Sequence, residues 1–308
     1  MVGIMVSGNP KVSVVIPTYN CDLYINEAID SVLEQTFSDY EIIIVDNSST
    51  DRTVELIESY SDSRVQLVSC QNNGIIAKSR NIGVSISQGE FLAFLDGDDL
   101  WYPQKLEICI PLLSSAFDLV YHGELWFDNQ GNSRSVKYRA EDRSSYSKLL
   151  AKGNNISTSS VVVRKSVLER VGGFCENPEY ISAEDYDLWM RLALNGASFK
   201  YVDQILGGYR IHALNTVKQE VVHERAVSSV LVDHYNSNRS GTLKSIRLRR
   251  RLALVYAESG YRKAADGKLL QSAIKFLKSM FCFPLSARSV FLFFLSVIKL
   301  LGWNRGNL

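Results

Sequence analysis

The chain has 308 residues, 46% of them hydrophobic and 22% charged, with a formal net charge of +1. These values are ordinary for a soluble globular protein with a real core, built as one large domain or one domain with appendages. The small net charge hides an asymmetry. Residues from Ser240 onward carry 13 Lys and Arg against 2 Asp and Glu, which leaves the preceding part acidic by 10 charges. An acidic body with a basic tail suggests that the tail meets an anionic partner.

Cysteine usage excludes two further classes of protein. The five cysteines are odd in number and none lies at metal-ligand spacing, so the sequence predicts neither a disulfide framework nor a zinc site. Reduced thiols in the cytosol are the expectation. The N-terminal MVGIMVSGNPKVS lacks a basic start and a long apolar core, so no signal peptide is expected.

The first hundred residues alternate between short apolar runs and amphipathic stretches. Each run is apolar and mostly β-branched, as expected of strands buried on both faces, and a turn and a helical pattern follow it. Such repeats predict an α/β fold with a parallel sheet and helices on both faces. The predicted strands are VSVVI (12–16), EIIIVD (41–46), VQLVS (65–69) and FLAFLD (91–96).

Beyond Trp101 the pattern changes. YPQKLEICIPLLSS predicts a helix interrupted at Pro111, and two strands around the turn NQGN predict a hairpin. SSVVVRK (159–165) predicts a strand, KSVLERVGGF a helix ended by its glycines, and SAEDYDLWMRLALNG a further helix. SFKYVD and LGGYRIH predict two strands, and from about Thr216 the chain is expected to be helical to its end.

Polar residues follow three of the predicted strands at the point where each strand ends. Ligands of open α/β sheets bind beyond the carboxyl ends of the strands, so these residues are expected to meet at one edge. The sequence therefore predicts a site there. The residues are Thr18, Tyr19, Asp46, Asn47, Ser48 and 96–99.

The turn DGDD carries the most distinctive of these residues. Asp96 and Asp98 flank Gly97, and two carboxylates at this spacing can share a divalent cation. Magnesium typically keeps its other positions for phosphate oxygens and water, and the glycine lets the backbone approach a ligand closely. A solvated acidic turn gives the same short pattern. These three residues alone leave both interpretations open.

Several motifs in order resemble the family 2 glycosyltransferases, which have the GT-A fold. The resemblance covers roughly residues 10–215 and implies a mostly parallel sheet with flanking helices. It also implies an inverting enzyme that moves a sugar from a nucleotide diphosphate sugar to an acceptor. The motifs are VSVVIPTYN, VDNSSTD, NNGIIAKSRNIGV, FLAFLDGDDLW, NNISTSSVVVRKSVLERVGGF, SAEDYDLW and GGYRIH.

The resemblance implies roles for the first two strand ends. Pro17, Thr18 and Tyr19 match the first nucleotide-binding turn. Asp46 matches the acid that accepts the ring N–H of the nucleobase, usually uracil. The family often has a second acid at the next position, where this chain has Asn47. This departure weakens any role assigned to that second position and leaves Asp46 in place.

The resemblance also implies a diphosphate and metal site. Arg80 matches a basic residue near the nucleotide, although an exposed helical arginine would fit the local sequence too. Asp96 and Gly97 match residues that face the donor. Asp98 matches the ligand of a divalent metal, Mn²⁺ or Mg²⁺. His212 follows a strand and is expected to ligate the metal or to meet the diphosphate.

On the acceptor side, Asp185 matches the general base of the family. An inverting transfer needs a base to remove the proton of the acceptor hydroxyl as the new bond forms. Glu184 is expected to contact the acceptor or neighbouring backbone, and Trp101 to stack on a sugar or pack in the core. Local sequence offers an alternative for the acidic pair. Ser182 three residues before Asp185 resembles a capping box, in which acids favour a helix start.

The C-terminal stretch VFLFFLSVIKLLGW (290–303) is the most apolar part of the chain. It is too short for a confident membrane span, and Lys299 interrupts it. Basic and aromatic residues upstream indicate helices that lie in the interface of an anionic membrane. The alternative is an appendage packed on the body or on a second subunit. RLRRR (247–251) suits anionic lipid, and no nucleic-acid motif accompanies it.

Together these observations predict a glycosyltransferase domain over 1–215, with a nucleotide-binding part at about 10–101 and an acceptor part at about 102–215. A helical extension follows over 216–308. The predicted enzyme is cytoplasmic and peripheral on the inner face of the cell membrane, and an oligomer is compatible with the sequence. It would use a UDP-sugar and a glycan or lipid-linked hydroxyl in surface polysaccharide synthesis. A polyprenyl-phosphate sugar synthase and a non-catalytic glycan-binding scaffold are the alternatives.

Overall fold

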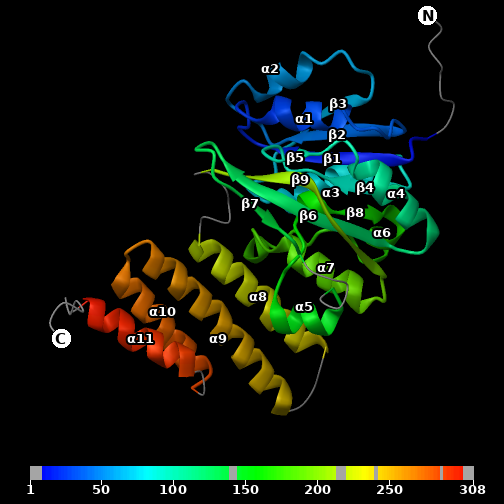
Figure 1. Ribbon diagram of the computed structural model, residues 1–308. Coiled ribbons are helices and arrows are strands. Elements are labelled where there is room, and N and C mark those ends of the chain that lie inside the picture. Colours follow the sequence, from blue (N-terminus) through cyan, green and yellow to red (C-terminus); the bar gives the residue numbers. More distant parts are fainter. Residues whose placement is uncertain (1–8, 139–143, 213–219, 239–241, 285–286, 301–308) are drawn as a thin grey trace, which may run out of the picture. The chain divides into compact units, whose positions relative to one another are not determined.

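The computed structural model describes residues 9–138, 144–212, 220–238, 242–284 and 287–300 (Figure 1). The chain divides into two compact units. The first consists of Met1–Leu149 and Gly153–Asn215, and the second of Leu150–Lys152 and Thr216–Leu308. The first unit holds the sheet and the second is helical, so each is described by itself.

Within the described residues, nine strands form a single sheet in the order β3-β2-β1-β4-β8-β6-β9-β5, with β7 paired to β6. The α/β class is confirmed. The strands are β1 (Val12–Thr18), β2 (Tyr40–Asp46), β3 (Val65–Ser69), β4 (Phe91–Phe94), β5 (Leu100–Trp101), β6 (Leu119–Asp128), β7 (Ser133–Val136), β8 (Val162–Arg164) and β9 (Phe199–Ile211). The helices up to residue 194 are α1 (Ile25–Leu33), α2 (Thr53–Glu58), α3 (Ile76–Ile86), α4 (Lys105–Ser115), α5 (Tyr146–Lys152), α6 (Lys165–Arg170) and α7 (Glu184–Leu194).

β1 lies inside the parallel part of the sheet, between β2 and β4. Successive side chains of a strand point to opposite faces. Ile16 lies in the main hydrophobic cluster with Ile25 and Ile29 of α1. Val15 points to the other face, where a Cβ on Gly83 of α3 would come within 2.5 Å of its Cγ1. α1 and α3 therefore cover opposite faces, which confirms the predicted layers and explains why a glycine stands at that point of α3.

β8 changes the sheet from parallel to mixed. It runs antiparallel to both neighbours, with Phe91 opposite Arg164 on the β4 side and Leu119 opposite Val163 on the β6 side. β9 then pairs parallel with β6 and antiparallel with β5. The predicted parallel order thus holds from β3 to β4. Beyond β4 the strands run in both directions, so this half of the sheet is mixed.

β9 is one continuous strand, where the sequence predicts two. Its two glycines lie inside the sheet and mark close contacts there. A Cβ on Gly207 would come within 2.9 Å of the Leu100 carbonyl oxygen, and one on Gly208 within 2.7 Å of Phe127 Cε1.

α4 is also continuous, where the sequence predicts an interruption at Pro111. Proline removes one N–H donor from a helix and costs stability there. Leu106 and Cys109 before the proline and Leu113 after it are fully buried in the main cluster. Their packing holds the helix together across the proline.

The described part of the second unit is helical, in keeping with the sequence pattern. Its helices α9 and α10 pack closely, because a Cβ on Gly260 would meet the Phe276 ring at 2.9 Å, and Ser272 Oγ donates to the Gly260 carbonyl at 2.8 Å. None of the described helices is both long and apolar enough to cross a membrane. The helices are α8 (Glu220–Asn238), α9 (Thr242–Ala265), α10 (Leu269–Cys282) and α11 (Ala287–Leu300).

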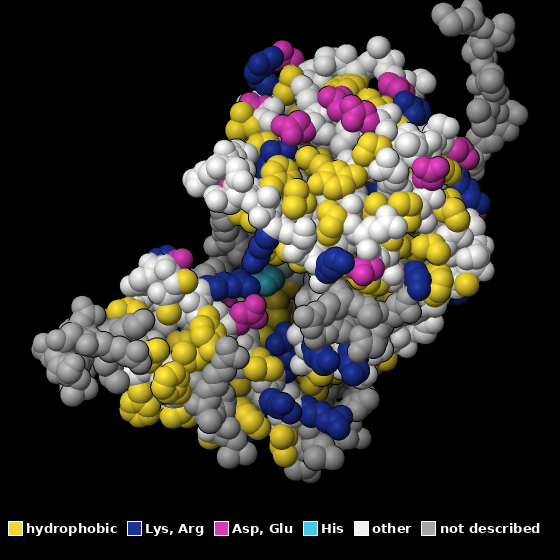
Figure 2. All heavy atoms as spheres, in the orientation of Figure 1, with side chains coloured by type: hydrophobic (Ala, Val, Ile, Leu, Met, Phe, Trp, Pro, Cys, Tyr) yellow, Lys and Arg dark blue, Asp and Glu magenta, His cyan; other side chains and the backbone are white. Residues whose placement is uncertain are grey.

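The opposite side of α10 carries an exposed apolar ridge, formed by Leu270, Ile274, Leu277 and Phe281. Their spacing of four, three and four residues places them on one face of the helix. Figure 2 shows hydrophobic side chains gathered over the part of the chain that holds α10 and α11. The helix is therefore amphipathic, with its other face packed on α9.

Candidate active site

The loops that follow β1, β2 and β3 are bonded to one another, as expected for strand ends that share one sheet edge. Asn47 N donates to the Thr18 carbonyl at 2.9 Å. Asn20 Oδ1 accepts from Thr50 N at 2.8 Å, and Asn47 Oδ1 accepts from Asn72 N at 2.7 Å. Asn47, which stands where the family often has an acid, thus joins the second loop to the third. Neutral amides hold this part of the site in shape.

Asp46 is almost fully buried, with 1% of its surface exposed. Both carboxylate oxygens accept hydrogen bonds from Ser49, from its Oγ at 2.5 Å and its N at 3.0 Å. The intervening Ser48 has a φ of +56°, a strained backbone that these bonds stabilise. The structure thus gives Asp46 a role in ordering its loop, and its contact with a nucleobase stays a prediction.

The first predicted nucleotide-binding turn lies beside the acidic turn. Pro17 and Thr18 end β1 and are buried, whereas the Tyr19 side chain is 55% exposed and free to meet a ligand. Gly97 packs against this turn, because a Cβ there would come within 3.2 Å of Thr18 Oγ1. A larger residue at that position would push the two turns apart.

Asp98 and His212 meet although 114 residues separate them, with Asp98 Oδ2 2.8 Å from His212 Nε2. Arg210 fixes this encounter. Its Nε donates to the Asp98 carbonyl at 3.0 Å, and its backbone N donates to Asp99 Oδ1 at 2.9 Å. The structure therefore brings both predicted metal ligands together. Among the residues that it describes, no three His, Cys, Asp or Glu side chains form a cluster able to hold a metal ion.

The donor set of this pair fits a divalent cation. A carboxylate oxygen and an imidazole nitrogen 2.8 Å apart can bind the same ion at neighbouring positions. Magnesium strongly prefers oxygen ligands, whereas an imidazole nitrogen suits a transition metal. A mixed pair of this kind is compatible with a divalent transition metal. Its two donors leave the other coordination positions to phosphate oxygens and water.

Ser159 connects the acidic turn to the second half of the sheet. Its Oγ donates to Asp99 Oδ2 at 2.6 Å and accepts from Asp96 N at 3.1 Å. Its carbonyl accepts from Trp101 Nε1 at 2.9 Å and from Lys105 Nζ at 2.7 Å. Sequence reasoning missed this residue. The motif NNISTSSVVVRK signalled the segment, but nothing in it distinguishes one serine from the next.

These contacts favour core packing over sugar stacking, the two alternatives for Trp101, and do not support a place for it in the acceptor site. Its side chain is only 2% exposed, and its indole donates to Ser159 while Lys105 Nζ lies 3.5 Å from the ring centre. The ring packs in the core and presents no face for stacking on a sugar. Burial of the ammonium lowers the pKa of Lys105 to about 7.

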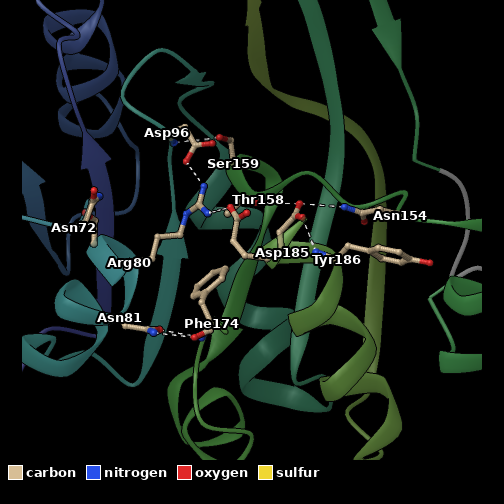
Figure 3. A network of polar contacts seen from close by, with 12 residues as sticks. Asn72, Arg80, Asn81, Asp96, Asn154, Thr158, Ser159, Phe174, Asp185 and Tyr186 are labelled. Carbon is tan, nitrogen blue, oxygen red and sulfur yellow. Dashed lines mark hydrogen bonds and ion pairs between the residues drawn. The ribbon is translucent and has the colours of Figure 1, made fainter. Parts of the chain in front are cut away.

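Arg80 is a buried bridge between two acids (Figure 3). It is 2% exposed, with one guanidinium nitrogen 2.7 Å from Asp96 Oδ1 and the other 2.6 Å from Glu184 Oε1. The exposed-arginine alternative is wrong. The charge of Arg80 is therefore already shared by two carboxylates. Burial raises the pKa of Asp96 even so, although Arg80 opposes the rise.

Glu184 is 6% exposed, and its Oε2 has no hydrogen-bond partner among the described residues. The prediction that it contacts an acceptor therefore finds no support in this geometry. Its visible partner is Arg80, and the adjacent Asp185 is the more accessible of the two acids.

Asp185 lies in the first turn of α7 and is only partly buried. Its Oδ2 accepts from Asn154 Nδ2 at 3.0 Å and from Thr158 Oγ1 at 3.4 Å, and its Oδ1 accepts from Tyr186 N at 2.6 Å (Figure 3). Burial, reinforced by the charge of Glu184, raises the pKa of Asp185 to about 7. A carboxylate of this kind holds and releases a proton near neutral pH, which suits a general base. The N-cap position of α7 is taken by Ala183, which makes no side-chain cap bond, and the preceding Ser182 has a φ of +75°.

Glu124 is a second buried acid near this centre, and sequence reasoning did not find it. It is 1% exposed and accepts from the Tyr138 hydroxyl and, at 3.1 Å, from Ser157 Oγ. Burial raises the pKa of Glu124 to about 7. A lone glutamate in the strand-like run YHGELWFD gave no sign of such a role.

Comparison with solved structures identifies the fold. Residues 1–349 of TarS from S. aureus in complex with UDP-GlcNAc match with a TM-score of 0.64 and 19% identity, over 92% of this chain and 83% of that one. The mannosyltransferase PcManGT from Pyrobaculum calidifontis, in complex with GDP-Man and Mn²⁺, matches with a TM-score of 0.60 and 17% identity, over 96% and 86% of the two chains. The fold is therefore the GT-A fold of glycosyltransferases.

Sequence comparisons give the family. The models described as glycosyl transferase family 2 and glycosyl transferase family group 2 match residues 13–172 and 94–304. Two relatives from Escherichia coli, WfgD and WfaP, are each named UDP-Glc:alpha-D-GlcNAc-diphosphoundecaprenol beta-1,3-glucosyltransferase. WfgD is 33% identical over 59% of this chain and 69% of its own length, and WfaP 31% identical over 66% and 78%. The chain belongs to glycosyl transferase family 2, and it is an enzyme.

Proposed function

We propose that this enzyme transfers a sugar from a UDP-sugar to a hydroxyl of a lipid-linked glycan, with inversion at the anomeric carbon, in surface polysaccharide synthesis. The observation that carries the proposal is the position of Asp185. It is a partly buried carboxylate, oriented by Asn154, next to the ion-paired Arg80 and Asp96. The names of WfgD and WfaP state a UDP-glucose donor, a diphosphoundecaprenol-linked acceptor and a β product for those relatives.

The proposed chemistry is a single displacement. The acceptor hydroxyl oxygen attacks the anomeric carbon on the face opposite the nucleotide, and the bond from that carbon to the diphosphate oxygen breaks. Asp185 takes the hydroxyl proton as the new bond forms. The departing UDP keeps the electron pair of the broken bond. No covalent sugar–enzyme bond is required, so one carboxylate suffices as catalyst on the acceptor side.

On the donor side we propose that Pro17, Thr18 and Tyr19 line the nucleotide and that Asp46 accepts from the uracil N–H. Asp96 and Gly97 would face the ribose or donor sugar. Asp98 and His212 would hold Mn²⁺ beside the diphosphate, where a cation offsets the charge that develops on the leaving group. The Mn²⁺ in the mannosyltransferase of similar fold supports this assignment.

The alternative, transfer to a polyprenyl phosphate, fits the charges less well. A phosphate acceptor needs no base to remove a proton, and it would bring negative charge toward Asp185 and Glu184. The buried Arg80 already bridges Glu184 and Asp96. A neutral hydroxyl acceptor avoids this repulsion.

We further propose that the C-terminal unit holds the enzyme on the inner face of the cell membrane. The apolar ridge of α10 is exposed, and Arg249 lies at its end, donating to the Phe281 and Cys282 carbonyls at 3.1 and 3.0 Å. Beyond Asp266 the sequence has no acid and six Lys and Arg. Lys268 and Lys275 are paired with Asp266 and Glu224, and the remaining basic residues leave an excess of positive charge. Apolar side chains beside an excess of positive charge suit an anionic lipid surface.

The test is a matrix of donors and acceptors with the full-length protein. UDP-glucose, UDP-GlcNAc and GDP-mannose are each offered with a GlcNAc-diphospholipid and with a polyprenyl phosphate, and the product anomer is read by NMR. We expect transfer from a UDP-sugar to the diphospholipid glycan, with a β product from an α donor. Asp46→Asn should reduce the preference for UDP over GDP by roughly 5- to 150-fold, whereas the exposed Asp203→Asn should not. Retention of configuration, or transfer to polyprenyl phosphate alone, would overturn the proposal.

A further inference from the structure

The two adjacent acids of α7, Glu184 and Asp185, differ in burial and in their partners. Glu184 is buried and adjacent to Asp185 on α7, while Arg80 reaches Glu184 from α3, with 2.6 Å between Arg80 and Glu184 Oε1. The same guanidinium binds Asp96 at 2.7 Å, so one positive charge serves two carboxylates. The buried group consequently carries a net negative charge beside Asp185.

Besides the two acids, the aromatic ring of Phe174 also holds Arg80 in this place. Its guanidinium carbon lies 5.3 Å from the centre of the Phe174 ring. Asn81 fixes that ring by donating to the Phe174 carbonyl at 2.8 Å and accepting from its N at 2.9 Å. In Figure 3 Arg80 lies next to the Phe174 ring, and Asn81 is bonded to the Phe174 backbone. Arg80 therefore cannot swing toward a substrate phosphate without leaving both the ring and the acids.

We propose that Glu184 and Arg80 are positioning residues that tune the basicity of Asp185, with Glu184 increasing it and Arg80 limiting the increase. The inference rests on the proposed role of Asp185 as base. Physically, a neighbouring negative charge favours the protonated form of a carboxyl group, and a positive charge favours the ionised form. A helix start would otherwise stabilise the ionised form.

This division of roles explains why two adjacent acids begin α7. Glu184 is hidden from the acceptor and keeps its cation, whereas Asp185 is partly exposed and has neutral hydrogen-bond partners. Burial and the Glu184 charge raise the pKa of Asp185, and Arg80 lowers it. Asp187 on the same helix is paired with Arg191 at 2.7 Å. The charged and polar groups that act on the base are thus Glu184, Arg80, Asn154, Thr158 and the Tyr186 N–H, with Asp96 bound to Arg80.

The experiment follows the proton on Asp185 directly and needs no substrate. The full-length protein is labelled with ¹³C at the aspartate carboxyls and titrated by NMR from pH 5 to 9, and the Asp185 signal is assigned by its absence in Asp185→Asn. Glu184→Gln removes the negative charge and keeps the size of the side chain. We expect the midpoint of Asp185 to fall by on the order of one pH unit. Glu169→Gln, an exposed acid on α6, should leave it unchanged.

The effect of Arg80 is measured on the Glu184→Gln background, because removing Arg80 alone would also leave the Glu184 carboxylate without its ion-pair partner. Adding Arg80→Gln to Glu184→Gln should raise the Asp185 midpoint above that of the single variant. A midpoint that stays put in both comparisons, while thermal stability falls, would assign the two residues a structural role only and overturn the inference. Loss of transfer in Asp185→Asn is a separate result, so failure of the base and failure of its tuning are distinguishable.

Discussion

Two neighbouring parts of the site are built on different principles. The nucleotide loops, residues 17–22, 46–53 and 70–75, are joined mainly by amide and hydroxyl groups such as those of Asn20, Asn47 and Asn72. The acid centre consists of ionisable groups that are buried (Arg80, Asp99, Glu124 and Glu184) or partly buried (Asp96 and Asp185). The hydrogen bonds of the nucleotide loops fix the conformation of those loops. The acid centre keeps ionisable groups away from water, which costs stability.

The difference shows in proton affinity. Burial raises the pKa of Asp99 well above its usual range and raises the pKa values of Glu124 and Asp185 to about 7. A preorganised loop needs only to match a ligand that is already formed, and neutral hydrogen bonds do this without a large desolvation cost. A base must exchange a proton during the reaction, so its environment has to resist ionisation.

The Asp185→Asn substitution is the strongest test of this difference between the nucleotide loops and the acid centre. If the acid centre supplies the base, transfer should fall by about 10²- to 10⁴-fold while UDP binding stays unchanged, because the nucleotide loops are untouched. The measurement is the steady-state transfer rate beside calorimetric titration of UDP. Asp203→Asn, an exposed acid on β9, is the matched control. A rate within a few-fold of the wild type would mean that Asp185 only stabilises its helix start.

The next test concerns the junction between the two parts, where Asp98 meets His212. His212→Ala and Asp98→Asn should each weaken the Mn²⁺-dependent binding of UDP by about 10- to 100-fold, because each removes one of two protein donors. Calorimetric titration of UDP with Mn²⁺, with Mg²⁺ and with EDTA gives the comparison. His223→Ala in the second unit should behave as the wild type. Equal UDP affinity with and without Mn²⁺ would remove the metal from this junction.

The smallest effect on transfer is expected from the apolar ridge, which belongs to neither part of the site. Replacing Leu277 and Phe281 together by Glu should lower binding to anionic vesicles by about tenfold or more, because apolar burial is lost and negative charge is added. The transfer rate with a water-soluble acceptor should not change. Gln271→Glu on the same helix controls for charge alone. Undiminished vesicle binding by the double variant would locate the membrane contact elsewhere.

Sequence reasoning predicted the parallel half of the fold well, since β-branched runs such as VSVVI are buried on both faces and turns separate them. It was wrong where packing decides. Pro111 continues a helix because buried neighbours hold it, and the glycines of β9 lie inside a strand because Leu100 and Phe127 come close. Local patterns contain neither fact.

The candidate site divides in the same way. Asp98 and His212 could be assigned to one metal site from the sequence because each follows a strand within a recognisable motif. The structure brings the two side chains together. Ser159 and Glu124 could not be found, since their importance comes from partners far away in sequence. Arg80 was placed near the donor, but the sequence did not reveal that Glu184, 104 residues later, would share its charge.

The insertion of β8 between β4 and β6 has a consequence for synthesis of the chain. β4 forms its backbone pairs with β1 on one side and with residues 162–164 on the other. A ribosome adding about 5–20 residues per second delivers β8 roughly 3–14 seconds after β4. During that interval the nascent sheet presents β4 as an open edge, and open edges are sites of unwanted pairing. The stretch 10–101 is therefore half of a folding unit, whose stability depends on the arrival of the strand that closes it.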